Sequence, residues 1–162
     1  ILATLHRAEN TDSPERLQSI IAALEEIARE MPVVIPIHPR TRKKLQELNF
    51  NFKQTRLQLV DPVGYLEMVY LLKHCSFVAT DSGGLQKEAY FFKKYCITLR
   101  TETEWVELVE QGANIITGWR YEDILNSYKQ LKHTTKDVFS SPLYGDGQAG
   151  HIIIRELQRI DS

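Results

Sequence analysis

The sequence predicts an α/β fold built on one parallel β-sheet, and two patterns indicate this. Segments of strand type alternate with segments of helix type along the chain, and most strand segments are apolar throughout, without alternating polar residues. Such runs are typical of parallel strands that helices cover on both faces. Polar loops follow the strands, and the carboxyl ends of parallel strands are where such sheets bind their ligands.

Six strands and seven helices are expected in alternation. The first helix takes Ser13 as its N-cap and Pro14 as its first helical residue, and its apolar residues recur at helical spacing. The helix over residues 65–74 is expected to pack Leu66, Val69, Tyr70 and Leu72 inward. The strands are expected over 1–5, 33–37, 57–60, 77–80, 95–99 and 113–117. The helices are expected from Pro14 to the Met31-Pro32 stop, over 42–48 and 65–74, from Leu85 onward, and over 104–111, 121–132 and 149–160.

Size and composition indicate one globular domain of ordinary kind. The chain has 162 residues, and its net charge of -1 predicts no general attraction to nucleic acid or to a membrane. No run of about 18 apolar residues exists that could span a bilayer. Cys75 and Cys96 lie in or beside apolar runs, so we expect two buried free thiols and a reducing, cytoplasmic location. The chain starts abruptly at Ile1 in a strand-like run, without an initiator Met or a signal peptide, so a piece of a longer protein is expected.

The stretch Ser76–Ala89, SFVATDSGGLQKEA, is the centre of the functional interpretation. A strand turns through Asp81-Ser82-Gly83-Gly84 into a helix that opens at Leu85. Such a turn directs free backbone N–H groups and the positive end of the helix dipole at one point, and two glycines let a phosphate approach that backbone. Glu88 lies about one helical turn further on, where a carboxylate can accept from two ribose hydroxyls. The alternative is a tight βα turn with ordinary glycines.

The other polar loops also follow strands, so they share one edge of the sheet. They contribute His6, Arg7, Glu9, Asn10, His38 and Arg40, and the residues from Arg100 to Glu104. A cleft lined in this way offers cations for a diphosphate and a histidine that transfers protons near neutral pH. No metal-ligand cluster, GxGxxG or P-loop motif is present in the sequence.

Each of these residues also has a simpler structural interpretation. His6 could cap the first strand, His38-Pro39 could form a rigid turn, and Arg40 could be a solvated charge. Arg100 could pair only with Glu102 or Glu104.

Taken together, the loop sequences resemble a known family. The motifs are TLHRAEN (4–10), PIHPRT (36–41), DSGGLQKEA (81–89), RTETE (100–104) and YGDG (144–147), in that order. They resemble the C-terminal half of the non-hydrolysing UDP-N-acetylglucosamine 2-epimerases. The resemblance implies a Rossmann-like parallel sheet flanked by helices, the C-terminal half of a two-domain GT-B fold. Residues 1–162 would be the nucleotide-binding domain, and the N-terminal domain would be absent.

The resemblance implies an isomerase that interconverts UDP-GlcNAc and UDP-ManNAc by eliminating UDP and adding it back. It implies no metal or nicotinamide cofactor, a homodimer when the protein is full length, and no turnover by this domain alone. Three alternatives stay open: a UDP-2,3-diacetamido-2,3-dideoxyglucuronate 2-epimerase, a GT-B glycosyltransferase domain, and a non-catalytic nucleotide-binding module.

Residue roles carry over from the family motif by motif. His6 would be catalytic at the diphosphate, and Glu88 would bind the ribose. The uracil would lie against the backbone near Val63 and the side chain of Met68. Ser82, Gly83, Gly84 and Arg100 would complete the UDP site, and Arg7 and His38 match positions near a second, activating UDP-GlcNAc.

The sequence departs from the family pattern at four places. Leu5 stands where a threonine is usual, and Met68 stands where an aromatic residue is usual. Lys87 replaces a frequent acidic residue on a helix side that is expected to face water. Trp105 replaces an arginine, and the resulting TEWVE motif (103–107) resembles that of the diacetamido-uronate epimerases.

Overall fold

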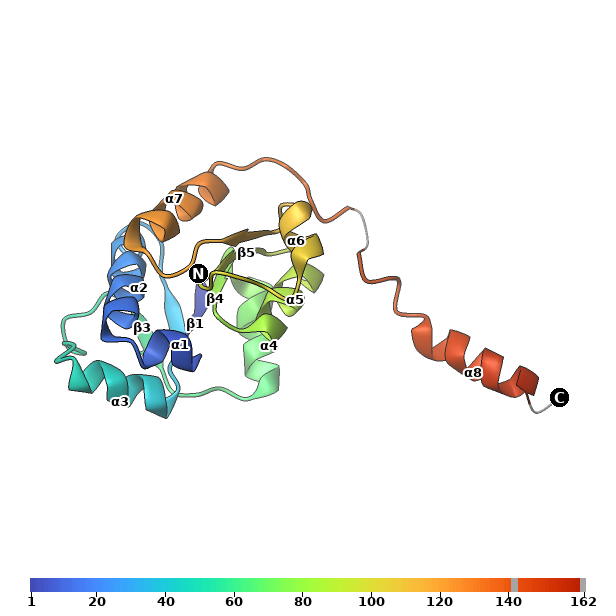
Figure 1. The fold of residues 1–162 in the computed structure, drawn as a ribbon, viewed down its shortest axis with the longest axis horizontal. Helices are drawn as coiled ribbons and strands as arrows, with labels where there is room; N and C mark the ends of the chain where they lie inside the picture. The colour runs from blue at the N-terminus through green and yellow to red at the C-terminus, as the bar shows by residue number, and fades with distance from the viewer. Residues whose placement is uncertain (141–142, 161–162) are drawn as a thin grey trace.

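The computed structural model describes residues 1–140 and 143–160, and it contains one six-stranded sheet with the order β3-β2-β1-β4-β5-β6. All neighbouring strands in it are parallel, which confirms the predicted sheet (Figure 1). The strands are β1 (Leu2–Thr4), β2 (Val34–Pro36), β3 (Gln58–Val60), β4 (Phe77–Thr80), β5 (Tyr95–Thr98) and β6 (Asn114–Ile116). Most are shorter at one or both ends than the apolar runs that predicted them.

Helices connect each strand to the next as crossovers, and two more helices follow the last strand. They are α1 (Ala8–Thr11), α2 (Pro14–Ile27), α3 (Pro39–Glu47), α4 (Tyr65–His74), α5 (Gly83–Phe91), α6 (Val106–Glu110), α7 (Tyr121–Lys132) and α8 (Ala149–Ile160). Ser13 caps α2 as predicted, because its side chain accepts from the Arg16 N–H.

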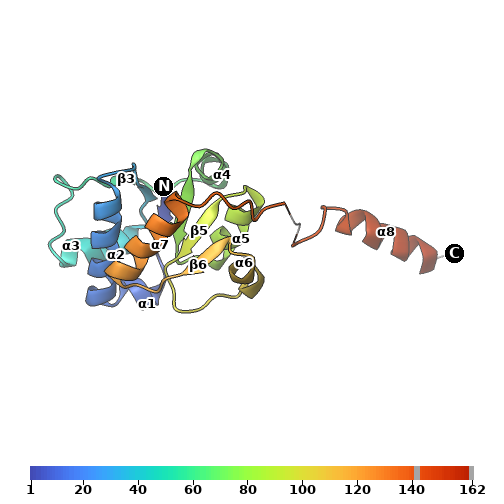
Figure 2. The same ribbon diagram turned by 90° about the horizontal axis from the view of Figure 1, so that it is seen from above.

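Alternate residues of the central strands pack on opposite faces of the sheet. Ala3, Ala79 and Ile97 are in register and pack with α2, α3 and α7 in one core. Their chain neighbours Leu2, Val78 and Cys96 pack with α4 and α5 in a second core. Figures 1 and 2 show these two groups of helices on either side of the sheet. The side chains of this chain therefore cover both faces of its central strands.

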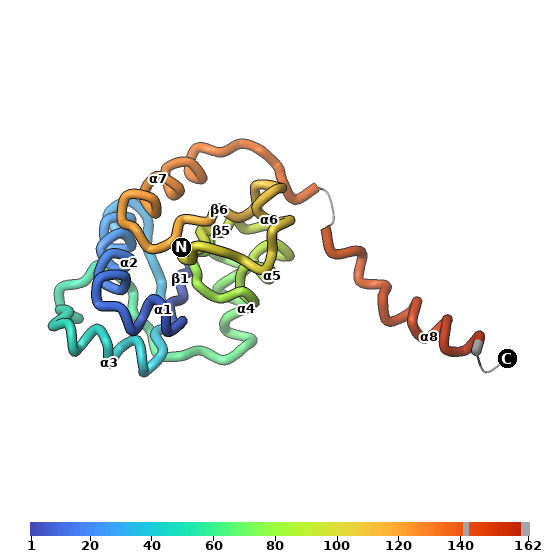
Figure 3. Tube along the Cα trace, viewed as in Figure 1, coloured from blue at the N-terminus to red at the C-terminus, as the bar shows by residue number. Residues whose placement is uncertain are grey.

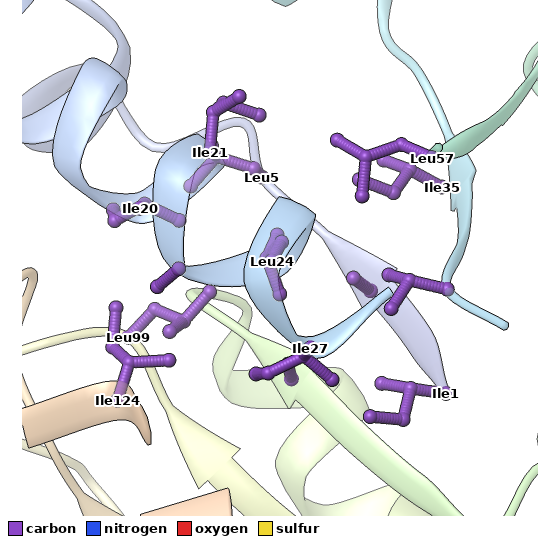
Figure 4. Packing of buried hydrophobic residues seen from close by; sticks show 14 of the residues in the cluster. Ile1, Leu5, Ile20, Ile21, Leu24, Ile27, Ile35, Leu57, Leu99 and Ile124 are labelled. Carbon is purple, nitrogen blue, oxygen red and sulfur yellow. The ribbon is translucent and has the colours of Figure 1, made fainter. Parts of the chain in front are cut away.

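Helix α2 supplies much of the larger core. Leu17, Ile20 and Leu24 are fully buried at helical spacing. Figure 4 shows Ile20, Leu24 and Ile27 turned toward side chains from β-strands and from α7. This is the one-sided apolar face that the periodicity predicted.

Two helices begin earlier than predicted, and a short helical segment was missed. Residues 39–41, expected as loop, form the first turn of α3, because Pro39 suits the first helical position and His38 caps the helix. Gly83 and Gly84 are the first two residues of α5 and not a preceding turn. Residues 6–10 were expected as a loop, but Ala8–Thr11 form α1. Helix α6 begins at Val106, two residues later than expected.

The prediction for α4 was wrong in part. Leu72 is fully buried as expected, but Leu66 is 80% exposed and Tyr70 is 64% exposed. Periodicity alone does not determine which apolar residues another element covers.

The C-terminal segment is separate from the sheet. Helix α8 lies away from the other elements, and its residues 149–159 are exposed (Figures 1 and 3). Cys75 and Cys96 are free thiols, as expected; Cys96 is buried and Cys75 is half-buried. Within the described ranges, no helix is long and apolar enough to cross a membrane.

Candidate functional site

A cavity of about 370 Å³ opens where β1, β2 and β4 end. Strand β1 lies between β2 and β4 in the sheet, so the loops after these three strands are neighbours. The cavity is lined by Thr4, Leu5, His6, Pro36, His38, Pro62, Val63, Met68, Ser82, Gly84, Leu85 and Glu88. Seven of the predicted site residues are therefore brought together here: His6, His38, Val63, Met68, Ser82, Gly84 and Glu88.

The beginning of α5 forms one wall of this cavity. The Ser82 side chain caps the helix by accepting from the Leu85 N–H. Among the described residues, no acceptor is found for the N–H groups of Gly83 and Gly84, which are the first two of the helix. These donors, together with the positive end of the helix dipole, suit an anionic group.

The two glycines have different surroundings. A Cβ on Gly83 would lie 3.0 Å from Glu104 Oε2, so this glycine is packed against the loop before α6. The Trp105 indole N–H also donates to the Gly83 carbonyl oxygen, at 2.7 Å. A Cβ on Gly84 would meet only Ser82 Oγ, at 3.9 Å. Gly84 is thus the glycine that leaves room on the cavity side.

Asp81 fixes the loop that carries His6, and sequence reasoning gave it no role. Its side chain is completely buried and accepts from the backbone N–H groups of His6 and Arg7, at 3.0–3.2 Å. Asn10 Nδ2 donates to the same carboxylate at 3.2 Å and to the Leu99 carbonyl at 2.9 Å. The sequence around Asp81 carries no signal for these bonds, because their partners lie more than 70 residues away along the chain.

Arg100 lies outside the lining of the cavity. Its guanidinium is 5% exposed and contacts Glu104 at 2.8–2.9 Å, with Glu9 and Glu102 at 3.5 and 3.8 Å. Hydrogen bonding to Glu104 raises the pKa of Arg100, and the same hydrogen bond lowers the pKa of Glu104. The simpler interpretation, that Arg100 pairs with nearby carboxylates, describes the contacts found. Arg7 also lies outside the lining, with its side chain 3.5 Å from Glu104.

Lys87 is half-buried against aromatic rings, whereas a side chain facing water was expected. Its ammonium lies 4.4 Å from the ring centroids of both Trp105 and Tyr144. Burial and a hydrogen bond to Glu107 raise the pKa of Tyr144. This aromatic cluster joins α5 to the residues before α8, so the substitution at position 87 has a packing role.

Two further features of the chain help to locate the site. No group of three or more His, Cys, Asp or Glu side chains that could hold a metal ion occurs within residues 1–140 and 143–160. A larger cavity of about 530 Å³ lies beside α2 and α3, lined in part by Ile21, Leu45 and Phe50. Its lining contains no histidine, and the N–H of Tyr121, the first residue of α7 in that lining, already donates to Ser19 Oγ at 2.9 Å, so we place the candidate site in the smaller cavity.

The sequence matches known proteins over nearly its whole length. Residues 1–158 match the family model of UDP-N-acetylglucosamine 2-epimerase. The chain is 51% identical over 162 residues to the UDP-2,3-diacetamido-2,3-dideoxy-D-glucuronate 2-epimerase of Pseudomonas aeruginosa, covering 99% of this chain and 44% of that protein. It is 40% identical to the UDP-N-acetylglucosamine 2-epimerase of Methanocaldococcus jannaschii, covering 96% of this chain and 43% of the relative.

Solved structures of UDP-GlcNAc 2-epimerases also match this chain over nearly its whole length. The M. jannaschii UDP-GlcNAc 2-epimerase in complex with UDP-GlcNAc and UDP matches with a TM-score of 0.82 and 40% identity, over 98% of this chain and 44% of that one. The Neisseria meningitidis enzyme bound to UDP-GlcNAc matches with a TM-score of 0.81 and 32% identity, over the same shares.

The fold is therefore Rossmann-like and corresponds to one half of a GT-B protein. The chain spans about 44% of the length of these relatives. Because the family model covers residues 1–158, the chain belongs to the UDP-N-acetylglucosamine 2-epimerase family.

Proposed function

We propose that residues 1–162 are the UDP-binding, C-terminal domain of a non-hydrolysing 2-epimerase acting on UDP-N-acetylglucosamine. The observation that supports this most is that one cavity combines three features: the open N-terminus of α5, the His6 imidazole and the Glu88 carboxylate. An anion site, a proton carrier and a hydroxyl acceptor are what a nucleoside diphosphate sugar requires. Two relatives of similar fold have UDP-GlcNAc bound.

In the proposed complex, the diphosphate lies at Ser82 and the N–H groups of Gly83 and Gly84. The ribose hydroxyls donate to Glu88, one helical turn further along α5. The uracil lies against the backbone near Val63 and beside Met68, which also line the cavity. His6 lies near the diphosphate. Arg100 lies behind the site and supports the loop through Glu104.

The proposed reaction eliminates UDP and adds it back. A base removes the C2 proton, the C1–O bond breaks toward the β-phosphate, and a 2-acetamidoglucal remains. The proton then returns to C2 from the other face, and UDP adds to C1 again. Negative charge grows on the departing phosphate, so helix-end N–H groups and a protonated His6 stabilise the transition state more than the bound substrate.

The groups that move the C2 proton are expected from the N-terminal half of the protein. This domain alone should therefore bind UDP without turnover. No metal or nicotinamide is required by this chemistry. We also infer a homodimer in the full-length protein, a cytoplasmic location in keeping with two free thiols, and a second UDP-sugar near Arg7 and His38.

A second candidate substrate is the UDP-2,3-diacetamido-2,3-dideoxyglucuronate. The 51% identity to the P. aeruginosa enzyme favours it, as does Trp105 in the TEWVE motif. The same elimination chemistry would apply, with a different sugar in the cleft.

The test is a substrate panel on the full-length protein. Each UDP-sugar is incubated alone, and C2 epimers, glucal and free UDP are followed by NMR. We expect epimerisation of UDP-GlcNAc with glucal as a minor product. Epimerisation of only the diacetamido uronate would select the second candidate. Sugar transfer that needs an acceptor, or UDP binding without epimerisation, would contradict the proposal.

A further inference from the structure

Asp81 is a buried carboxylate with hydrogen bonds but almost no charge compensation. It is 0% exposed, and its three hydrogen-bond donors are two backbone N–H groups and the Asn10 amide, all neutral. In the described part of the chain, the His6 imidazole is the only ionisable cation within 4.0 Å of it. A buried carboxylate is costly unless it is hydrogen-bonded and balanced by positive charge. The charge of Asp81 therefore acts mainly on His6.

Asp81 contacts His6 at two points. The His6 backbone N–H donates to it at 3.2 Å, and His6 Nδ1 lies 3.6 Å from Asp81 Oδ1. The second distance is in the range of an electrostatic contact and is longer than a hydrogen bond. This contact still places the negative charge of Asp81 beside Nδ1 of the His6 ring. Nε2, on the other side of the ring, is the nitrogen left for a ligand in the cavity that His6 lines.

We propose that Asp81 is the positioning residue of His6: it holds the proton of the neutral imidazole on Nδ1, so that Nε2 faces the ligand. This inference rests on the proposed function only for its consequence in catalysis. In catalysis, Nε2 is the atom that exchanges a proton with the diphosphate. Asp81 determines that this atom is Nε2 and not Nδ1. The tautomer of a histidine follows from the partner of its other nitrogen.

Two other histidines provide references within the same molecule. His38 Nδ1 accepts from the Arg40 N–H at 3.2 Å, so neutral His38 must carry its proton on Nε2. His74 Nδ1 lies 2.7 Å from the Tyr70 carbonyl oxygen, so it must donate, and neutral His74 carries its proton on Nδ1. The chain has five histidines, few enough for separate ring signals.

The experiment is ¹⁵N NMR of the histidine rings in this chain without nucleotide, at about pH 9, well above the ordinary histidine pKa of about 6.5. His6→Ala assigns the His6 signals. We expect wild-type His6 to resemble His74, with most of its proton on Nδ1. A wild-type His6 that resembles His38 would overturn the proposal without any variant of Asp81.

Asp81→Asn should reverse the tautomer. The Arg7 N–H and Asn10 Nδ2 both point at Oδ2, at 3.0 and 3.2 Å, so the new amide oxygen must take that place. Its NH₂ group then takes the place of Oδ1, facing His6 Nδ1, and favours the proton on Nε2. An unchanged tautomer in Asp81→Asn would contradict the proposal.

Asn10→Ala is the matched control. It removes another buried bond that fixes the same loop but leaves the Asp81 charge in place. We expect both variants to be less stable, and only Asp81→Asn to change the tautomer. Equal tautomer changes in both would reduce Asp81 to a structural anchor of the loop.

Activity gives a second measurement in the full-length protein. Asp81→Asn should lower kcat about tenfold, less than the roughly 10²–10⁴-fold that the positioned proton carrier itself contributes, with little change in KM. Adding UDP to the NMR sample separates the two proposals. If UDP leaves the His6 ring signals unchanged while the tautomers are as expected, the proposed function fails and the Asp81–His6 relationship stands.

Discussion

The hydroxyl oxygens of Thr4 and Thr80 lie 2.6 Å apart and join the carboxyl ends of β1 and β4. Thr80 Oγ1 also accepts from the Ser82 N–H at 2.9 Å. One buried hydroxyl thus connects the strand that leads to His6 with the strand that leads to the beginning of α5.

Thr80→Val should therefore destabilise the domain. It keeps the shape of a β-branched residue but leaves the half-buried Ser82 N–H and the buried Thr4 hydroxyl without this partner. The expected loss in the free energy of unfolding is about 1–3 kcal/mol, measured by urea denaturation. Thr98→Val is the control, because Thr98 is the register partner of Thr80 in β5 and, among the described residues, its hydroxyl has only a 4.0 Å contact with Cys96 Sγ. A larger loss in the control would contradict this account.

The two glycines of α5 should respond differently to alanine. Gly84→Ala places a methyl group where the cavity is open, so it should weaken UDP binding while the stability of the domain stays nearly unchanged. Gly83→Ala brings a methyl group to 3.0 Å from Glu104, so it should lower stability and affect UDP affinity less. Calorimetric titration and thermal unfolding of both variants check this. Equal effects of the two substitutions on affinity would argue against phosphate binding beside Gly84.

The Arg100–Glu104 pair predicts a pH-dependent stability. Hydrogen bonding to Arg100 holds the pKa of Glu104 below its ordinary value of 4.5. A carboxyl group with a lowered folded-state pKa stabilises the protein above its unfolded-state pKa, and this contribution disappears as pH falls through the folded-state pKa.

Wild type should therefore be more stable than Glu104→Gln at pH 7, and the difference should shrink below about pH 4.5. Urea unfolding at a series of pH values measures it. Glu102→Gln is the control, because that side chain is 83% exposed and lies 3.8 Å from Arg100. A difference that stays constant from pH 7 to pH 3 would show that the charge of Glu104 is not responsible.

Cys96 should be chemically inert in the folded domain. Burial raises the pKa of its thiol to about 12 and also raises the pKa of Cys75. Near pH 8 a disulfide reagent should modify Cys96 only after unfolding, and the Cys75→Ser variant isolates this reaction. A raised thiol pKa stabilises the folded state below the ordinary value of 9.0, so stability should also fall as pH rises from 9 toward 12. Rapid labelling of Cys96 in the native protein would refute the burial argument.

Local signals predicted the features that local chemistry determines. The Ser13-Pro14 pair located the start of α2, and α7 begins and ends at the predicted residues. The apolar runs of β4 and β5 gave central strands of a parallel sheet. In each case the signal that predicts the element lies within a few residues in the sequence.

Tertiary contacts decided what the sequence left open. Leu66 and Tyr70 have the spacing of buried residues, but in the described structure no neighbouring element covers them. Arg100 sits in a loop at the correct edge of the sheet, yet three carboxylates, one from α1 and two from its own loop, surround it. The bonds of Asp81 span more than 70 residues, so no local pattern displays them.

Glu88 should contribute directly to nucleotide affinity. Glu88→Ala should weaken UDP binding by about 1.5–3 kcal/mol, the range for hydrogen bonds to a charged group. Isothermal titration of this chain measures it, with Glu110→Ala on the exposed side of α6 as a control that should leave affinity unchanged. Unchanged affinity in Glu88→Ala would remove this carboxylate from the site.

A crystal structure of this chain with UDP tests the central claim most directly. We predict phosphate oxygens at the N–H groups of Gly83 and Gly84, ribose hydroxyls at Glu88, and the His6 ring turned toward the diphosphate. UDP bound elsewhere while the beginning of α5 stays empty, or His6 turned away from the phosphates, would contradict the proposed function.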